Sequence, residues 1–429
     1  MEIKRQKYLD MLVTRKHNGF IKVITGIRRC GKSYLLNNLF SDDLIKSGVD
    51  NSHIIKFAFD SADDLIKIDA DLEVLANNKK VDAKKFIEYI YSKILDDKMY
   101  YILLDEVQNL NCFESVLNGF SRKPNLDIYV TGSNSKLLSH DVLTEFEGRG
   151  DEIHVLPLSF SEYTSALASP SDYDLDEYMI YGGLPAVVKM QTDEQKINYL
   201  QTQIKNVYLR DIVSRYNLAS DQNLGELFNI IASGISTLTN PSKLSNTFKS
   251  VKNNSISAST INKYIEYMED SFLIKRVNRY DVKGKHYIDT PYKIYFEDIG
   301  LRNAQLNFRQ IENTHIMENI IYNELRYRNF NVDVGVVECR ETTDGKSERK
   351  QLEIDFVANK GNQRYYIQSA YDIPNEQKMQ QETKSFNKID DSFKKIIVCE
   401  KNIRPRRNEK GYLIIGIREF LLNPNSLEL

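Results

Sequence analysis

Two short stretches of this chain combine the residue types that phosphate chemistry requires. Residues 26–33 read GIRRCGKS, the pattern G-x-x-x-x-G-K-S, and residues 105–106 read Asp-Glu after the apolar run YYILL. Gly26 and Gly31 would let backbone N–H groups approach a phosphate at the start of a helix, where the helix dipole is positive. Two adjacent carboxylates would hold Mg²⁺ through its water ligands and take a proton from water. This combination predicts binding and hydrolysis of ATP with Mg²⁺.

The spacing gives the residues of the two stretches predicted roles. Lys32 would reach the β- and γ-phosphates, and Ser33 and Asp105 would be the metal ligands. Glu106 would be the general base for the attacking water. The residues of the loop predicted to contact the nucleotide are Gly26, Ile27, Arg28, Arg29, Cys30, Gly31, Lys32, Ser33 and Tyr34. The alternative interpretations are a chance glycine turn for the first stretch and a solvent-exposed acidic strand end for the second.

Buried strands must bring these stretches to one edge of a sheet. The apolar run FIKVIT precedes the glycine pattern, and YLLNNLF follows it with the apolar spacing of a helix. A third apolar run, LDIYV, ends in the polar residues 131–134. Because open α/β sheets bind ligands at the carboxyl ends of their strands, Ser133 or Asn134 is predicted to sense the γ-phosphate. A plain turn at this point is the equally weighted alternative.

Composition limits the class of protein. A chain of 429 residues predicts more than one domain, and 41% hydrophobic with 28% charged residues is typical of a folded protein. No apolar run approaches the ~20 residues of a membrane span, and the charged start MEIKRQKYLDML lacks the apolar region of a signal peptide. These features predict a cytoplasmic protein without a membrane partner. The net charge of -2 excludes a strongly basic nucleic-acid binder, although local basic patches remain open.

Five motifs, taken in order, resemble a known family. The motifs are GIRRCGKS, ILLDEVQ, VTGSNSKLL, EGRGDEIHVLPLSFSEY and YGGLPAVV. In this order they are similar to those of the bacterial and archaeal ATP-binding proteins of the AAA superfamily that carry a C-terminal domain of unknown function. The resemblance covers nearly the whole chain and implies a P-loop ATPase core with a helical lid. Because AAA proteins commonly form rings, it also leaves a homo-oligomer open.

The resemblance suggests two further site residues. Arg149, in EGRGD, is predicted to be a phosphate-sensing or finger arginine, which would make it catalytic together with Glu106 and Ser133. A surface salt bridge with Asp151 or Glu152 is the alternative. Pro185, in GGLP, is similar to a lid proline that lies near adenine in related ATPases, although a helix-breaking turn explains this motif nearly as well.

The region after the predicted lid changes to short helices followed by two strand-like runs. Three helices and then a hairpin indicate a winged helix over residues 221–300, and the resemblance includes such a module. The third helix presents mostly acidic residues outward, whereas the hairpin is rich in lysine and arginine. Protein packing is therefore favoured over nucleic-acid contact for this module, and both stay open.

The last third follows the order of a restriction-endonuclease-like domain. Such a site uses an acid on a helix, an Asp on the second strand and Glu-x-Lys on the third. Glu318 and Asp355 occupy the first two places, but the third place reads Gln368-Ser369-Ala370. Because two charged groups are missing, the sequence predicts a nuclease-like fold without cleavage. The basic loops at 345–350 and 404–410 indicate a binding platform or simply solubility.

The predicted architecture is α/β in four parts. They are a P-loop AAA-type ATPase core over 1–165, a helical lid over 166–220, a winged helix over 221–300 and an inactive restriction-endonuclease-like domain over 301–429. The predicted function is Mg²⁺-dependent ATP hydrolysis coupled to rearrangement of the winged-helix and nuclease-like parts, with DNA or a protein as partner. The alternative is a nucleotide-dependent regulatory switch, or a nucleic-acid-binding platform, with little turnover.

Overall fold

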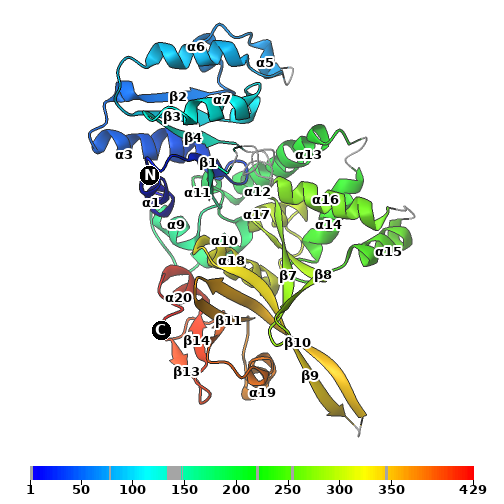
Figure 1. Ribbon diagram of the computed structural model, residues 1–429. Helices are drawn as coiled ribbons and strands as arrows, with labels where there is room; N and C mark the ends of the chain where they lie inside the picture. Colours follow the sequence, from blue (N-terminus) through cyan, green and yellow to red (C-terminus); the bar gives the residue numbers. More distant parts are fainter. Residues whose placement is uncertain are drawn as a thin grey trace. The chain divides into compact units, whose positions relative to one another are not determined.

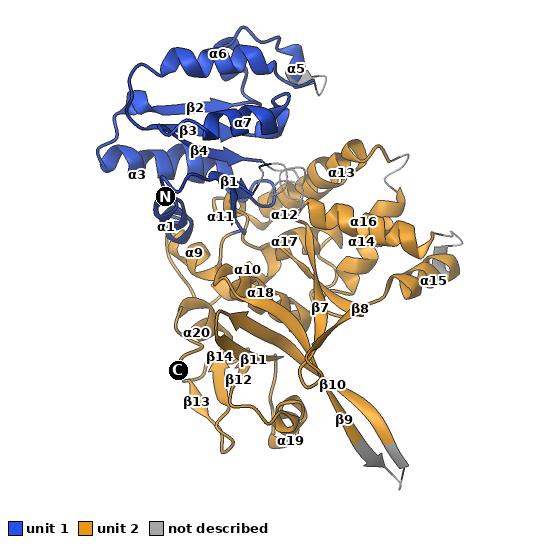
Figure 2. Cartoon of the chain, viewed as in Figure 1, with its two compact units in different colours: residues 1–157 blue, residues 158–429 orange. Residues whose placement is uncertain are grey.

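The computed structural model describes residues 3–76, 79–132, 146, 148–218, 222–252, 256–343 and 346–429. The chain forms two compact units, residues 1–157 and residues 158–429 (Figures 1 and 2). The predicted end of the ATPase core at residue 165 therefore falls just inside the second unit. The chain has the α/β character that the sequence predicted, with a parallel sheet in the first unit and a second, sheet-rich unit.

A five-stranded parallel sheet forms the centre of the first unit, with the strand order β2-β3-β4-β1-β5. Its strands are β1 (Ile21–Thr25), β2 (Ile54–Ala58), β3 (Tyr100–Asp105), β4 (Leu126–Thr131) and β5 (Gly150–His154). Every residue of β1, β3 and β4 is buried, as expected for parallel strands that helices cover on both faces. These three strands are the ones whose carboxyl ends carry the predicted site.

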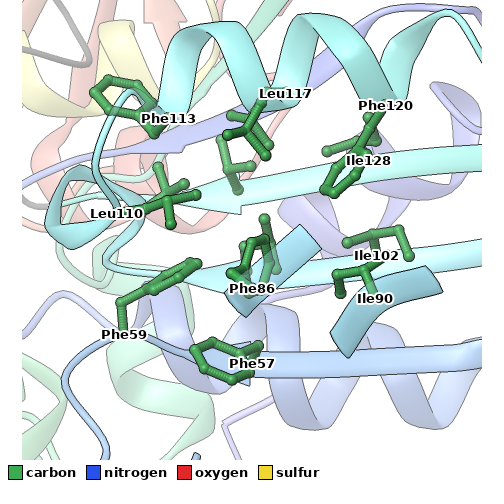
Figure 3. Close-up of a cluster of buried hydrophobic side chains, with 14 of the residues drawn as sticks. Phe57, Phe59, Phe86, Ile90, Ile102, Leu110, Phe113, Leu117, Phe120 and Ile128 are labelled. Atoms are coloured by element: carbon green, nitrogen blue, oxygen red, sulfur yellow. The ribbon is translucent and has the colours of Figure 1, made fainter. Parts of the chain in front are cut away.

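Apolar helix faces fix this sheet in place. The helices and helical turns of the unit are α1 (Gln6–Thr14), α2 (Lys32–Tyr34), η1 (Leu35–Phe40), α3 (Ser41–Lys46), η2 (Asn51–His53), α4 (Ala62–Ile66), α5 (Glu73–Ala76), α6 (Ala83–Lys93), η3 (Val107–Asn109) and α7 (Phe113–Ser121). Figure 3 shows Phe113, Leu117 and Phe120, spaced for one face of α7, pointing toward the strands. Phe86 of α6 packs on Phe57, with ring centroids 5.1 Å apart. Burying one such ring stabilises the fold by about 2–3 kcal/mol.

The second unit contains a nine-stranded mixed sheet with the order β13-β14-β12-β11-β10-β9-β7-β8-β6. Its strands are β6 (Leu238–Thr239), β7 (Ile274–Asp281), β8 (His286–Phe296), β9 (Asn331–Thr343), β10 (Lys346–Lys360), β11 (Gln363–Ala370), β12 (Lys394–Cys399), β13 (Arg406–Arg407) and β14 (Leu413–Gly416). Strand β7 pairs with β9 in parallel through Arg279 and Val334. The sheet therefore continues across residue 300, where the sequence placed a domain boundary, and the domain limits inside this unit stay predictions.

The second unit also contains helices and helical turns, and two strands and a helix follow β12, which the sequence predicted as the last strand. The helices and helical turns are α9 (Phe160–Ser165), α10 (Asp174–Tyr181), α11 (Pro185–Val188), α12 (Asp193–Thr202), η5 (Gln203–Leu209), α13 (Arg210–Arg215), α14 (Gln222–Ser233), α15 (Pro241–Lys252), α16 (Ala258–Asp270), α17 (Ile299–Gln305), α18 (Asn313–Tyr327), α19 (Glu376–Glu382), η6 (Phe386–Lys388) and α20 (Ile417–Leu422). Helices α14, α15 and α16 precede the β7–β8 hairpin, which is the order of the predicted winged helix. Within the described part of the chain, no helix has the length and apolar character needed to cross a membrane.

The GGLP motif ends α10 against the start of α17. Asp298 is 2% exposed, and its carboxylate accepts hydrogen bonds from the backbone N–H groups of Gly183 (2.8 Å) and Leu301 (3.0 Å). A Cβ atom at Gly182, where φ is 74°, would lie 2.5 Å from this carboxylate. Gly300 needs to be glycine for the same reason, because its Cβ would collide with the carbonyl oxygen of Tyr181. Close packing therefore accounts for the paired glycines of the motif.

The buried carboxyl group of Asp298 should make stability depend on pH. Burial raises its pKa to about 6, although the hydrogen bonds from Gly183, Leu301 and Gly300 act in the opposite direction. A carboxyl group with a raised folded-state pKa binds more protons in the folded state, so its contribution to stability declines as pH rises from about 4 to about 6. Between pH 4 and pH 7 the wild type should lose about 2.5 kcal/mol of unfolding free energy relative to Asp298→Asn. Urea unfolding of both proteins at pH 4 and pH 7 measures this difference, and a difference that does not change with pH would contradict the assignment.

Candidate nucleotide-binding site

The glycine-rich loop leaves β1 and enters α2 in a conformation that needs its glycines. Gly26 has a φ of 136°, and a Cβ atom at this position would collide with the carbonyl oxygen of Val155. Gly31, with a φ of 100°, is the N-cap of α2. Both dihedral angles lie in the region that side chains disfavour. The two glycines of the motif thus bring the backbone of the loop to the first turn of the helix, as the strand-loop-helix prediction required.

The side chains of this loop divide into anchors and exposed groups. Ile27 and Cys30 are fully buried and hold the loop on the sheet. Arg28 is half-buried, whereas Arg29 and Tyr34 are exposed. Of the predicted nucleotide-binding residues, the buried pair would therefore contribute backbone N–H groups, and the other three would offer side chains as well.

Lys32 is held inside the loop by backbone oxygens. Its Nζ donates hydrogen bonds to the carbonyl oxygens of Gly26 (2.9 Å) and Ile27 (3.0 Å), and the residue is 5% exposed. A phosphate oxygen is a stronger acceptor for an ammonium group than a peptide carbonyl. The loop therefore keeps the ammonium group at the position from which it would bind phosphate.

The two predicted metal ligands lie next to each other. Asp105 is 6% exposed at the end of β3, and its carboxylate is hydrogen-bonded to the hydroxyl groups of Ser33 and Thr131. Burial raises the pKa of Asp105, while these two hydrogen bonds and the charge of Lys32 lower it. Ser33 is exposed, so a ligand can reach its hydroxyl group. A hydroxyl and a carboxylate oxygen are hard ligands of the kind that Mg²⁺ prefers, and the pair fits such an ion.

Glu106 follows Asp105 with a left-handed backbone. Its φ is 52°, and its N–H group donates to the Thr131 hydroxyl at 3.3 Å. Its carboxylate accepts a hydrogen bond from the side-chain amide of Gln108. Thr131 therefore orients both acidic residues from β4, and Gln108 holds the predicted base. The sequence assigned neither of these supporting roles.

A third carboxylate lies near the acidic pair. Asp60 follows β2, and the parallel register pairs Ala58 of β2 with Asp105 of β3. Partial desolvation, followed by the charges of Glu106 and Asp105, raises the pKa of Asp60. The sequence analysis did not include this residue. Its signal was the short apolar run IIKFAF ending in an acid, the same pattern as at Asp105.

Arg149 lies at the other end of the sheet from the glycine-rich loop. Its carbonyl oxygen accepts a hydrogen bond from the N–H group of Ile21 at 2.8 Å, at the start of β1, whereas the loop follows the end of β1. Asp151, one of its predicted salt-bridge partners, pairs with Arg15 at 2.9 Å. The length of β1 therefore separates Arg149 from a phosphate bound by its own loop, and this part of the prediction is corrected. A finger acting on the nucleotide of a neighbouring subunit stays a prediction.

The remaining predicted residues have different outcomes. Ser133 and Asn134 lie outside the described residues. Pro185 is the first residue of α11, in the second unit, and its role beside adenine stays a prediction. In the second unit, Glu318 and Asp355 lie close together, because both are paired with Lys293, at 2.8 Å and 3.6 Å. The sequence analysis did not single out Lys293.

Comparisons with known proteins match the first part of the chain and much of the second part to two different families. Residues 18–164 match the family described as an AAA domain, and residues 172–312 match a domain of unknown function (DUF8612). The first match includes the glycine-rich loop and the acidic pair. An uncharacterized protein of Haemophilus influenzae is 33% identical over 426 residues, 98% of each chain. The uncharacterized protein MJ1544 of Methanocaldococcus jannaschii is 28% identical over 388 residues, 86% of this chain and 78% of that protein.

Two solved structures are similar at low TM-scores. AMPPCP-bound DnaA from Aquifex aeolicus is 15% identical, with 63% of this chain and 89% of that chain covered and a TM-score of 0.32. The Aeropyrum pernix ORC1 protein in complex with DNA is 12% identical, with 70% and 91% covered and a TM-score of 0.30.

Proposed function

Since this chain belongs to the family of bacterial and archaeal AAA-domain ATP-binding proteins, we propose that it binds ATP with Mg²⁺ and hydrolyses it at the carboxyl ends of β1, β3 and β4. One observation carries the proposal. The Ser33 hydroxyl is hydrogen-bonded to Asp105, beside the ammonium group of Lys32. An ammonium group, a hydroxyl group and a carboxylate thus come together from α2, which follows β1, and from the end of β3, and this supports the proposed binding of phosphate and Mg²⁺.

The residues of the site would divide the work of binding. Backbone N–H groups of the loop between Gly26 and Gly31 would surround the β-phosphate, and Lys32 would leave its two carbonyl partners for the β- and γ-phosphates. Ser33 and Asp105 would hold Mg²⁺, directly or through its water. When bound, Mg²⁺ supplies charge neutralisation at the phosphate oxygens.

Glu106 would act on the attacking water. Glu106 directly follows Asp105, and its carboxylate would lie beside the proposed metal ligands, where it could act as a general base. Thr131, bonded to Asp105 and to the Glu106 N–H group, would keep the two acids in fixed relation. The oxygen of Glu106 that accepts from Gln108 would be oriented by this bond, and water would approach the other oxygen.

The same Gln108 contact also favours a second candidate function. A base that is held by a neighbouring amide is partly withdrawn from water, which would give a nucleotide-dependent switch with little turnover. In that case bound ATP or ADP would set the arrangement of the domains, and hydrolysis would only reset it.

Steady-state phosphate release, measured together with equilibrium ATP binding, tests the proposed function. The enzyme should bind ATP and release phosphate with Mg²⁺ and should lose turnover with EDTA. Adding single- or double-stranded DNA tests whether a nucleic-acid partner stimulates turnover. A protein that binds ATP tightly but does not release phosphate under any of these conditions would support the switch. A protein that does not bind ATP would exclude both functions.

Two basic side chains of the predicted winged-helix hairpin already have partners within the second unit. In the predicted winged-helix hairpin, Arg276 is paired with Glu269, and Arg279 is 7% exposed and donates to Gln351 at 2.8 Å. These guanidinium groups therefore already serve the fold and are less available to phosphates. The coupling of ATP hydrolysis to a rearrangement of this unit is part of the proposal.

We expect no nucleic-acid cleavage by the second unit. Gln368 and Ala370 lack the charges that a metal-dependent nuclease uses to hold its ion and to stabilise the developing charge on phosphate. Incubation with single- and double-stranded DNA and RNA, with Mg²⁺ or Mn²⁺ and with or without ATP, should leave each substrate intact. Cleavage that disappears in Asp355→Ala would show that the prediction is wrong.

A further inference from the structure

Three acidic side chains of the second unit surround the ammonium group of Lys293. Its Nζ is 2.8 Å from Glu318 Oε1 and 2.7 Å from Glu353 Oε1. Asp355 Oδ1 is 3.6 Å away. Lys293 is 3% exposed, Glu318 6% and Asp355 7%, so at least three of these charges lie in the interior. Charges removed from water to this degree are costly unless they are paired, and the ammonium group is the shared partner.

These side chains come from parts of the chain that are far apart in sequence. Lys293 is on β8, in the predicted winged helix, whereas Glu318 is on α18 and Glu353 and Asp355 are on β10, in the predicted nuclease-like part. The Tyr295 hydroxyl, also on β8, donates to Glu318 Oε1 at 2.7 Å. The cluster therefore joins the two predicted modules through charge-assisted hydrogen bonds.

Strand β11 also contributes a hydrogen bond to the cluster. The backbone N–H group of Ser369 donates to Asp355 Oδ2 at 2.8 Å. Phe356, the neighbour of Asp355 in β10, pairs with Ile367 of β11. The carboxyl group of Asp355 is therefore held from β11 as well as by Lys293.

The charges of the cluster do not balance. Three carboxyl groups surround one ammonium group, which leaves a negative surplus. Burial, followed by the charge of Glu318, raises the pKa of Asp355 to about 8, as expected where negative charge exceeds positive. Burial lowers the pKa of Lys293, but the three carboxyl groups together raise it above its ordinary value. The lysine therefore stays charged throughout the physiological range.

Carboxylate and amide oxygens are the ligands that Mg²⁺ and Mn²⁺ prefer, yet this cluster surrounds an amine. Among the residues that the structure describes, no three acidic, histidine or cysteine side chains are arranged to hold a metal ion. We propose that the ammonium group of Lys293 takes the place of a divalent cation among these carboxyl groups and closes the cluster to metal. A divalent ion at the same carboxylates would be repelled by the ammonium group and would have to lose tightly held water.

This inference goes beyond the proposed ATPase and does not depend on it. It also gives the predicted lack of cleavage a second cause. Beyond the missing charges at Gln368 and Ala370, the acidic side chains Glu318 and Asp355 are already paired with an internal cation. The fold would thus have a fixed ionic junction at the position where a hydrolytic site would bind a metal.

The test measures Mn²⁺ binding by nucleotide-free protein, using Mn²⁺ as the probe in electron paramagnetic resonance titrations. Lys293→Gln should bind one more Mn²⁺ per chain than the wild type, with a Kd of roughly 10⁻⁴–10⁻³ M, as for sites with few charged ligands. The double variant Lys293→Gln with Asp355→Asn should lose this additional ion. Lys275→Gln is the matched control, because it removes an exposed lysine of the neighbouring strand β7. Any binding of Mn²⁺ at the P-loop would be common to all these proteins and would subtract out.

Melting temperatures provide the second readout. Lys293→Gln should melt at a lower temperature than the wild type and recover part of the loss when Mn²⁺ is added, whereas the wild type and Lys275→Gln should not respond. A folded Lys293→Gln protein that gains neither an ion nor stability would overturn the proposal. If this variant does not fold even with Mn²⁺, a comparison of Mn²⁺ binding by the wild type and by Asp355→Asn tests the proposal instead. Mn²⁺ binding by the wild type that is lost in Asp355→Asn would overturn the proposal, and equal binding by both would support it.

Discussion

Lys32→Ala should weaken ATP binding by roughly 10²–10⁴-fold, because each charge-assisted hydrogen bond to phosphate contributes about 1.5–3 kcal/mol. The ammonium group of Lys32 is already fixed at the loop by the carbonyl oxygens of Gly26 and Ile27. Little conformational entropy is therefore lost when a phosphate replaces them. Alanine removes this cation and leaves the glycine turns of the loop unchanged. Isothermal titration calorimetry with ATP and Mg²⁺ measures the loss.

Lys56→Ala is the matched control for this variant. Lys56 is exposed on β2, and its Nζ donates to the carbonyl oxygen of Asn37 at 2.7 Å. Its removal should leave ATP affinity within about twofold, as expected for an exposed group away from the site. Circular dichroism should show that both variants are folded. Unchanged ATP affinity in a folded Lys32→Ala protein would show that the loop is not the phosphate site.

Glu106→Gln should lower ATP turnover by ~10²-fold or more and leave ATP affinity nearly unchanged. Glutamine keeps the shape of the side chain but cannot accept the proton of the attacking water. Asp105 and Ser33, which would hold Mg²⁺, are not altered. Steady-state phosphate release together with calorimetry separates the two effects.

Glu88→Gln provides the control, because it makes the same change on the exposed face of α6. It should leave both turnover and affinity at the parental level. If Glu106→Gln releases phosphate at the parental rate, another group activates the water. Asp60, the third carboxylate of the site, would then be the first residue to examine.

The loop and the acidic pair were predictable because their chemistry is local. A glycine pattern between a strand and a helix defines its own conformation, and Asp105 and Glu106 end a buried run. Asp60 was not predicted because its place depends on the pairing of β2 with β3, and no pattern near residue 60 specifies that register. Thr131 was within a predicted strand, but its contact with Asp105 likewise required the order of the strands.

Arg149 shows how an ordered set of motifs misleads about space. Arg149 directly precedes β5, and β5 runs parallel to β1, so the arginine must be at the amino end of these strands. The prediction put Arg149 next to phosphate because it relied on the order of the motifs in a family and not on their positions in the sheet. Only the acting-in-trans form of the prediction is compatible with the fold.

The charged cluster around Lys293 could be found only from the tertiary structure, because its residues come from two predicted modules. The sequence sought an amine on the third strand of the nuclease-like part and found Ala370 there. The lysine of the cluster, Lys293, belongs to β8, in a part of the chain that was assigned to another module. Similarly, Gly182 of GGLP is explained by Asp298, which comes from a distant stretch of sequence, and Gly183 by the backbone of Leu158.

Single-turnover hydrolysis, with protein in excess over radiolabelled ATP, tests the central claim most directly. With Mg²⁺ the wild type should convert its bound ATP to ADP and phosphate, whereas Glu106→Gln should retain bound ATP and Lys32→Ala should bind none. Because the protein is in excess, slow product release cannot conceal the chemical step. If the wild type hydrolyses its bound ATP no faster than Glu106→Gln does, the site is not an ATPase. The account of Glu106 as the base is then contradicted.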